Sequence, residues 1–514
     1  MLTTLAAPAF AGTWYIENGD ITVKASGTEG KNKVSQGNNP EVEDTDTIIT
    51  NQNKDTASSH TVTIDAGSDK VEVTLKDVNI KADSGSALTS EGDVTLTLKG
   101  DNSLTGGISD NGSYGRYGIN SNGSLTITGG ETDRLTAQGG SGTYDGGSGI
   151  YSNGSLTLSG GTVNANGGKS GGRSDGGIGI HSGSLTITGS TVNATGGNGS
   201  NDRSSSGGSG IHIFGNGSLT VSDGTVTANG GNGGNVSGDG IRSDGGVTIS
   251  GGTVNAAGGD SKDGYGGDGI RSGGGVTISG NTVNAAGGNG GKVGGYGICS
   301  FDRVAISGGT VEAAGGSSGS SNGGSGIYSN DIDLSGSLEL TAKAGSPNGK
   351  ALSQNGSELD LDTIKDKLGP GAKVTATDAN GETKQVSIPR PVEPEGPVIP
   401  EESSSSSDGG SAAPSAPASS LPGLTVTDKD GQRISYTSTQ SGNTLTVCVG
   451  RLTASFRISL AALRQLRAEG IDTITFQTIL CSTTLSVDEL LAMGGEDAEA
   501  VLTHRFTDSS LTVG

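Results

Sequence analysis

The stretch GIYSNGSLTLSGGTVNANGG, at residues 149–168, recurs along the chain with its apolar residues in the same places. Close copies are GIHSGSLTITGSTVNATGG at 179–197, GIRSDGGVTISGGTVNAAGG at 240–259 and GIRSGGGVTISGNTVNAAGG at 269–288. The first isoleucine of each copy marks the repeat, at steps of 28 to 31 residues: Ile119, Ile150, Ile180, Ile211, Ile241, Ile270, Ile298 and Ile327. A period this steady predicts a stacked array of structural repeats.

Each copy contains three short segments in which apolar and polar residues alternate. In the copy at 149–168 these segments are 150–152, 156–158 and 163–165, each bounded by Gly or Asn, a pattern typical of strands. No helical period appears before residue 388. Three short strands per coil of about 30 residues predict an all-β fold, a right-handed parallel β-helix whose coils rise about 4.8 Å each.

The alternation also predicts which side chains fill the interior. The first column is the isoleucine series, the second is Leu125, Leu156, Leu185, Leu219, Val247, Val276 and Val304, and the third is Leu135, Val163, Val192, Val226, Val254, Val283 and Val311. An alanine follows two residues after each member of the third column, which leaves room where the coil bends. We expect these columns to be structural and to carry no chemistry.

The composition is unusual for a compact globular protein. Of 514 residues, 97 are Gly, 30% are hydrophobic and only 3% are aromatic. A solenoid tolerates this because each coil is covered by its neighbours and needs only a thin core. The net charge of −22 argues against a nucleic-acid partner, which requires a basic surface. Acidic side chains can instead hold calcium outside the cell.

The N-terminal residues indicate export. Residues 1–11 resemble the end of a secretory signal, with Ala9-Phe10-Ala11 as a cleavage site of the small-x-small type. We therefore expect a secreted or cell-surface protein of bacterial type, with the β-helix spanning 12–388. Weaker coils extend the array at both ends, and 373–388 reads as a closing hairpin. No apolar run reaches the length of a membrane span.

The C-terminal part of the chain differs in composition from the repeats. Residues 389–423 are rich in Pro and Ser and predict an extended linker. Residues 424–514 predict a small α+β domain of unknown role, with helices at 457–470 and 486–495. Three cysteines, Cys299, Cys448 and Cys481, are too few for a disulfide framework. The last two either pair with each other or remain free thiols.

One outward-facing column carries most of the chemically distinctive side chains. The residues directly after the isoleucines are Asn120, Tyr151, His181, His212, Arg242, Arg271, Cys299 and Tyr328. Rings stack on the apolar faces of sugars and Arg binds carboxylates with two hydrogen bonds. We predict that Tyr151, His181, His212, Arg242, Arg271 and Tyr328 bind an extended polysaccharide, including an acidic one. The alternative is that they are ordinary surface residues of strands.

Two adjacent coils repeat the sequence Asp-Gly-Ile-Arg, beginning at Asp239 and at Asp268. Carboxylates stacked one coil apart repel each other unless a cation lies between them, and calcium prefers oxygen ligands. The pair is therefore a candidate calcium site. The alternative is that Asp-Gly is ordinary turn sequence without a metal.

Two other faces of the coil are more uniform. The second strand presents a Thr-x-Thr or Thr-x-Ser pattern, which can match an ice lattice but is also typical of exposed strands. The third strand presents an Asn ladder, Asn164, Asn193, Asn255 and Asn284, interrupted by Thr227 and Glu312. We expect its stacked amides to stabilise the solenoid.

The coils VEVTLKDVNI, GIYSNGSLTLSGGTVNANGG and SGDGIRSDGGVTISGGTVNAAGG resemble a group of secreted bacterial carbohydrate-binding β-helix proteins, whose fold is similar to that of pectate-lyase-type polysaccharide lyases. The resemblance covers about residues 60–388. It implies a right-handed β-helix, calcium bound by loop carboxylates, and binding to plant-type polysaccharides such as cellulose or pectin. Only Asp239 and Asp268 match the group's Asp-Gly-Ile pattern; the equivalent residues elsewhere are Tyr117, Ser148, Ile178, Ser209, Tyr296 and Ser325.

These observations together favour a non-catalytic carbohydrate-binding or adhesive protein, displayed through the Pro/Ser-rich linker. One alternative is a calcium-dependent polysaccharide lyase, with Arg242 or Arg271 as the base and Asp239 and Asp268 as metal ligands. Base catalysis by Arg needs a strongly perturbed guanidinium, and no neighbouring sequence feature provides one. A further alternative is a structural or protein-binding surface adhesin.

Overall fold

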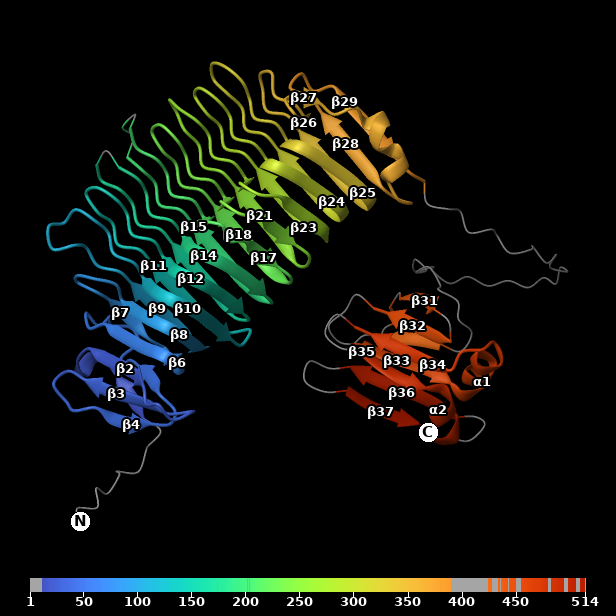
Figure 1. Cartoon of the computed structure of the whole chain (residues 1–514), viewed down its shortest axis with the longest axis horizontal. Helices are drawn as coiled ribbons and strands as arrows, with labels where there is room; N and C mark the ends of the chain where they lie inside the picture. The colour runs from blue at the N-terminus through green and yellow to red at the C-terminus, as the bar shows by residue number, and fades with distance from the viewer. Residues whose placement is uncertain are drawn as a thin grey trace, which may run out of the picture. The chain divides into compact units, whose positions relative to one another are not determined.

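The computed structural model describes residues 12–389 except 173, 201 and 203, and residues 424–513 except 428–432, 435, 442, 450–453, 479–481, 494–497 and 505–508. It divides into two compact units, Met1–Pro394 and Glu395–Gly514, both drawn in Figure 1. The predicted signal segment at 1–11 and the predicted linker after residue 389 lie outside the described residues.

The first unit is a parallel β-solenoid of about 13 turns, so the predicted parallel β-helix is confirmed. In Figure 1 its strands lie side by side as one continuous stack. The strands of the coils are β6 (Val62–Lys76), β7 (Asn79–Lys81), β8 (Leu88–Lys99), β9 (Asp101–Thr105), β10 (Ile119–Gly129), β11 (Arg134–Gln138), β12 (Ile150–Ser159), β13 (Thr162–Asn166), β14 (Ile180–Thr188), β15 (Ser190–Thr195), β16 (Ile211–Ile213), β17 (Leu219–Val221), β18 (Gly224–Asn229), β19 (Ile241–Ser243), β20 (Val247–Ile249), β21 (Thr253–Ala257), β22 (Ile270–Ser272), β23 (Val276–Ala286), β24 (Ile298–Ala314) and β25 (Ile327–Lys343).

Neighbouring coils pair in register, which places equivalent residues directly above one another. Ile150 pairs with Ile180, Leu156 with Leu185 and Val163 with Val192. All three predicted inward columns are buried, with at most 1% of any member exposed. The three segments of a coil are not always separate strands, because β24 and β25 each run through all of them.

A column of serines, which the sequence analysis did not single out, lies inside the first corner of the coil. Ser152, Ser182 and Ser272 are fully buried, two residues after the column isoleucines. The Ser182 hydroxyl donates to the carbonyl of Gly154 in the preceding coil at 3.4 Å, and that of Ser272 to the carbonyl of Gly245 at 2.8 Å. These hydroxyls satisfy buried turn carbonyls that would otherwise destabilise the fold.

The long loops between the third strand of one coil and the first strand of the next form an ordered array, which we call the glycine loop array. Gly168 N–H donates to the carbonyl of Gly147, and Gly177 N–H donates to Gly168, each at 2.8 Å. A Cβ atom on Gly168 would lie 1.9 Å from the Gly140 carbonyl oxygen, and one on Gly177 would lie 2.0 Å from the Gly147 oxygen. Glycine is therefore required here by the close approach of backbones.

Both ends of the solenoid are closed by antiparallel pairing. At the N-terminal end are β1 (Thr13–Tyr15), β2 (Ile21–Ala25), β3 (Asn32–Gln36), β4 (Val42–Asp44) and β5 (Ile48–Thr50); at the C-terminal end are β26 (Leu352–Gln354), β27 (Ser357–Glu358), the 3-10 helix η2 (Leu361–Lys367), β28 (Lys373–Thr377) and β29 (Thr383–Ser387). β2 pairs in parallel with β6 and antiparallel with β3. The predicted closing hairpin is confirmed as β28 and β29. Such caps protect the end coils from pairing with other chains.

The described residues of the second unit form two four-stranded sheets and two helices, which confirms an α+β fold. One sheet consists of β30 (Leu424–Thr427), β33 (Ala454–Ser459), β36 (Glu499–His504) and β37 (Ser509–Val513), and the other of β31 (Thr437–Ser441), β32 (Thr444–Cys448), β34 (Thr473–Gln477) and β35 (Ser482–Ser486). The helices are α1 (Leu460–Ala468) and α2 (Val487–Met493). Their buried faces pack with Phe456 and Phe476 into one core.

One expectation for this unit needs correction. The helix predicted from residue 457 begins at Leu460, because residues 457–459 belong to β33 and the Ser459 hydroxyl caps the helix by accepting from Ala462 N–H at 3.2 Å. Of the two alternatives left open for the cysteines, Cys448 is a free thiol, and Cys481 lies outside the described residues. Across the described ranges, no helix has the length and apolar character needed to cross a membrane.

Candidate functional site

The predicted polysaccharide-binding residues lie in one column on the outside of the solenoid. Tyr151 pairs with His181, His181 with His212, and the series continues through Arg242, Arg271, Cys299 and Tyr328. Each lies between a buried isoleucine and the buried residue that follows in its strand, so it points away from the core. We call this column, with the rings that contact it, the side-chain strip.

The N-terminal part of the strip is a cluster of five rings, which we call the aromatic half. Tyr151 stacks on Tyr117 with ring centres 5.0 Å apart, and His181 stacks on His212 at 5.0 Å. Phe214 lies 4.8 Å from the His181 ring and 6.1 Å from the Tyr151 ring. Tyr117 precedes β10 and Phe214 follows β16, so three coils and two loops contribute to the cluster.

Both histidines of the aromatic half favour the neutral state. Burial, reinforced by the neighbouring His212, lowers the pKa of His181 to about 4. Burial and the Arg242 guanidinium lower the pKa of His212, although Asp244 lies 3.7 Å from its Nε2. At neutral pH the aromatic half therefore presents uncharged rings with partly exposed faces.

The C-terminal part of the strip contains Arg242 and Arg271, and together with the underlying Asp239 and Asp268 it forms what we call the charged half. Asp268 N–H donates to Asp239 Oδ1 at 2.7 Å, and Tyr296 N–H donates to Asp268 Oδ1 at 2.7 Å. Arg271 Nη1 lies 3.4 Å from Asp268 Oδ2. The two carboxyls are thus buried beneath the strip and bound to the backbone of the following coil.

The buried position changes the protonation of both carboxyls. Burial raises the pKa of Asp239, and burial together with Asp239 raises that of Asp268 to about 7. Burial lowers the pKa of Arg271, but the two carboxylates outweigh that effect and raise it overall. Arg271 is therefore a poor general base, which weakens the lyase alternative.

The surroundings of Asp239 and Asp268 do not match a calcium site. Calcium takes six to eight oxygen ligands, whereas one oxygen of each carboxyl already accepts a backbone N–H and Arg271 lies against Asp268. The same contact between coils is made elsewhere by an amide, where Asn198 Oδ1 accepts from Asn232 N–H at 2.9 Å. Among the residues the structure describes, no cluster of three His, Cys, Asp or Glu could hold a metal. Calcium binding therefore stays a prediction from the sequence.

The last two members of the strip differ from the expected exposed ladder. Cys299 is 1% exposed, and burial raises the pKa of its thiol far above the usual range. Tyr328 stacks on Tyr296 at 4.9 Å, and the Arg271 guanidinium lies 5.1 Å from the centre of the Phe301 ring. Tyr328 is thus separated from the aromatic half by two arginines and a buried cysteine.

Four rings of the strip were missed in the sequence analysis, although their positions are regular. Tyr117 and Tyr296 lie two residues before a column isoleucine, and Phe214 and Phe301 lie three residues after one. The sequence alone did not indicate that these loop positions turn back toward the strip. These rings contact the column because the loops before and after the first strand of a coil fold back over the neighbouring strand residues.

The Asn ladder on the third face is a structural feature, as expected. Asn193 Nδ2 donates to Asn164 Oδ1 at 2.9 Å, and Asn284 Nδ2 donates to Asn255 Oδ1 at 2.8 Å. Each of these four amides is bonded to an amide of one neighbouring coil, so the side chains stabilise the stack.

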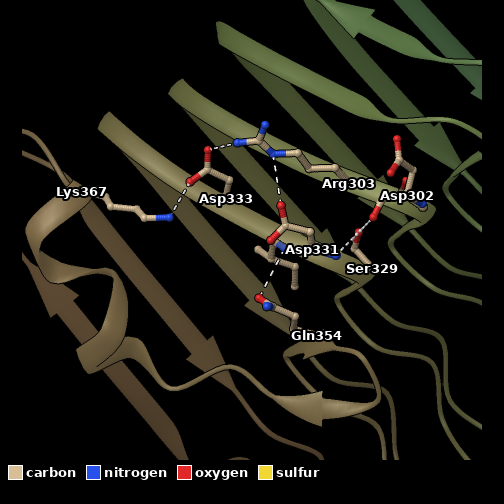
Figure 2. Close-up of polar contacts among 9 residues, drawn as sticks. Asp302, Arg303, Ser329, Asp331, Asp333, Gln354 and Lys367 are labelled. Carbon is tan, nitrogen blue, oxygen red and sulfur yellow. Dashed lines mark hydrogen bonds and ion pairs between the residues drawn. The ribbon is translucent and has the colours of Figure 1, made fainter.

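The C-terminal coils carry a network of ion pairs. Figure 2 shows Arg303 between Asp331 and Asp333, with Lys367 on the other side of Asp333. The Lys367 ammonium lies 3.1 Å from Asp333 Oδ1, and hydrogen bonding to it lowers the pKa of that carboxyl. Because Lys367 ends η2, the network connects this helix to the last coils of the solenoid.

Comparisons with protein-family models, with curated proteins and with solved structures gave no match to this chain. The solenoid fold implied by the resemblance to carbohydrate-binding β-helix proteins is therefore confirmed by the structure alone. The function implied by that resemblance rests on the side-chain strip.

Proposed function

We propose that the protein is a non-catalytic extracellular carbohydrate-binding or adhesive protein whose side-chain strip binds an extended polysaccharide. The observation that carries the proposal is the aromatic half. Two tyrosines, one phenylalanine and two of the four histidines form one ring cluster on one face of a chain in which only 3% of residues are Phe, Trp or Tyr. Rings this scarce are seldom gathered on a surface without a ligand to contact.

The chemistry of the aromatic half fits sugars. The apolar face of a pyranose packs on an aromatic ring while its hydroxyls remain hydrated or hydrogen-bonded. Neutral histidines add rings that also donate and accept hydrogen bonds. The rings are fixed by strands in register, so a ligand does not have to order them on binding.

The charged half can add polar contacts to the same polysaccharide. Arg242 is exposed, and its nearest carboxylate oxygen, on Asp244, is 3.7 Å away. It is free enough to bind a sugar hydroxyl or a uronate carboxylate. Arg271 is held by Asp268 and contributes less. Polysaccharides of plant type, including acidic ones, are the ligands that the resemblance suggests.

The test is retention of the full chain on insoluble cellulose, pectin, chitin and mucin, with and without calcium. We expect retention on at least one glycan, lost in the double variant Tyr151→Ala, Phe214→Ala. The matched control is Tyr265→Ala, which removes an exposed tyrosine of the glycine loop array outside the strip. The control variant should bind as the unmodified chain does.

Other outcomes would reject the proposal. Release of unsaturated sugars would assign a calcium-dependent or calcium-independent lyase in its place. Absence of retention on every glycan would favour a structural or protein-binding surface adhesin. Equal loss in the double variant and in Tyr265→Ala would remove the strip as the binding surface.

A further inference from the structure

The second strand of the coils presents a ladder of seven threonines, a face separate from the side-chain strip. Consecutive members pair in register across seven coils: Thr95, Thr126, Thr157, Thr186, Thr220, Thr248 and Thr277. They lie on β8, β10, β12, β14, β17, β20 and β23, which form a continuous stack in Figure 1. Adjacent hydroxyls are therefore repeated at the strand spacing of about 4.8 Å.

The hydroxyls of this threonine ladder are available to a ligand. All seven side chains are partly or fully exposed. Within the described part of the chain, none of the seven hydroxyls takes part in a hydrogen bond. The contrast with the third face is clear, because there the Asn side chains bond to each other from coil to coil.

A second column two residues further along each strand is less regular. It consists of Thr97, Thr128, Ser159, Thr188, Ser222, Ser250 and Ser279. Thr188 Oγ1 donates to the Leu158 carbonyl at 3.5 Å, and Ser222 Oγ donates to the Ile187 carbonyl at 3.4 Å. This column widens the hydroxyl-bearing face, but the first column carries the regular repeat.

The threonine ladder is uncharged along its length and ends at charged residues. In six consecutive coils, the five-residue segment centred on the ladder threonine contains only Ser, Thr, Gly, Leu, Ile and Val. These segments are 124–128, 155–159, 184–188, 218–222, 246–250 and 275–279. At the C-terminal end Thr277 pairs with Ala305, which pairs with Asp333 of the ion-pair network in Figure 2. At the N-terminal end the strand of Thr95 carries Asp93. The charges thus mark the limits of the regular array.

We propose that the threonine ladder is a second binding face, whose ligand is the ordered water lattice of an ice crystal. A regular spacing gives an advantage only with a ligand that is itself periodic. The absence of charge disfavours an ionic mineral, and the absence of rings disfavours a stacked polysaccharide. Alternating methyl and hydroxyl groups on a rigid sheet hold water in fixed positions, and an ice lattice can incorporate water held in this way.

The experiment measures partition of the full chain into a slowly growing ice front, together with inhibition of ice recrystallisation. We expect the unmodified chain to be enriched in ice. The double variant Thr157→Tyr, Thr186→Tyr should partition at least about tenfold less, a change equivalent to about 1.4 kcal/mol of binding free energy. Tyr is well tolerated on exposed strands, so the variant should remain folded, and thermal unfolding verifies this.

The matched control is Thr227→Tyr, which places the same bulk on the third face of the same array. It should partition into ice as the unmodified chain does. Exclusion of the unmodified chain from ice would overturn the proposal, as would equal loss in the control variant. Retention on crystalline polysaccharide that is lost in the Thr157→Tyr, Thr186→Tyr variant would also overturn it and assign the ladder to glycan. The polysaccharide test on the side-chain strip is independent, because its variants do not touch this face.

Discussion

The aromatic half and the charged half of the side-chain strip occupy the same column of the same solenoid, yet their chemistry is opposite. In the aromatic half, burial keeps two histidines neutral among three rings. In the charged half, burial raises the pKa of two carboxyls beneath two arginines. The comparison teaches that the scaffold sets only position and spacing. Which ligand each half can bind is decided by the few outward and loop side chains that each coil adds to the strip.

The most disruptive way to test this comparison is to damage the last coil of the aromatic half, which pairs directly with the first coil of the charged half. Ile211 is fully buried and pairs with Ile180 on one side and Ile241 on the other. Ile211→Ala should lower the free energy of unfolding by about 2–5 kcal/mol, because it leaves a cavity in a thin core. Denaturant unfolding measures the effect. Val236→Ala, at a position 39% exposed, is the control and should change the free energy by less than about 0.5 kcal/mol.

Glycan retention distinguishes a local effect of Ile211→Ala from a global one. If the two halves share one rigid scaffold, Ile211→Ala should weaken the binding of glycan by both halves when the protein is under mildly denaturing conditions. A loss of stability comparable to that of Val236→Ala would contradict the structure of the core.

The charged half predicts that stability falls as the pH rises. Because the pKa of Asp268 is raised to about 7, its stabilising contribution is present below the unfolded-state pKa of about 4 and is lost as the pH passes through 7. The size of the loss is about 2–4 kcal/mol. Asp268→Asn keeps an oxygen for Tyr296 N–H and removes the ionisation of Asp268, so the pH dependence should become weaker, leaving the part that comes from the raised pKa of Asp239.

The measurement is the free energy of unfolding between pH 4 and pH 8. Asp260→Asn, at an exposed loop position, is the matched control and should retain the slope of the unmodified chain. A slope unchanged by Asp268→Asn would contradict a buried, protonated carboxyl.

The aromatic half predicts the opposite and smaller trend. Because the pKa of His181 is lowered to about 4, its neutral state stabilises the fold above the unfolded-state pKa of about 6.5, and this contribution is lost as the pH falls toward 4. Partial exposure reduces the effect to about 1–2 kcal/mol. His181→Phe should reduce the loss on acidification to the part that comes from His212, and Tyr151→Phe should leave the whole loss in place. An equal response of both variants would mean that His181 does not titrate as its surroundings require.

Much of the architecture could be predicted from the sequence because the repeats fix the register. The isoleucine positions alone place the core columns, the order of the strip and the Asn ladder. The ring contacts of Tyr117 and Phe214 could not be predicted, since they depend on how loops of unequal length return to the sheet. Nor could the burial of Cys299, or the backbone hydrogen bonds that occupy Asp239 and Asp268. These follow from packing between coils, which a one-dimensional pattern does not contain.

The start of α1 illustrates the same limit in the second unit. Residues 457–459 have a pattern compatible with a helix, but they pair with β36 and complete a sheet. Long-range pairing overrides local propensity here. The cap at Ser459 was visible in the sequence only once the strand was known.

The most direct test of the account is the affinity of the full chain for its retained glycan, measured by calorimetry for two tyrosine variants. Tyr151→Ala removes a ring from the aromatic half, and Tyr328→Ala removes one from the far end of the strip beyond Cys299. We predict that Tyr151→Ala raises Kd by about tenfold or more and that Tyr328→Ala raises it by less than about threefold. Equal effects of the two variants, or none from Tyr151→Ala, would contradict the claim that the aromatic half binds the polysaccharide.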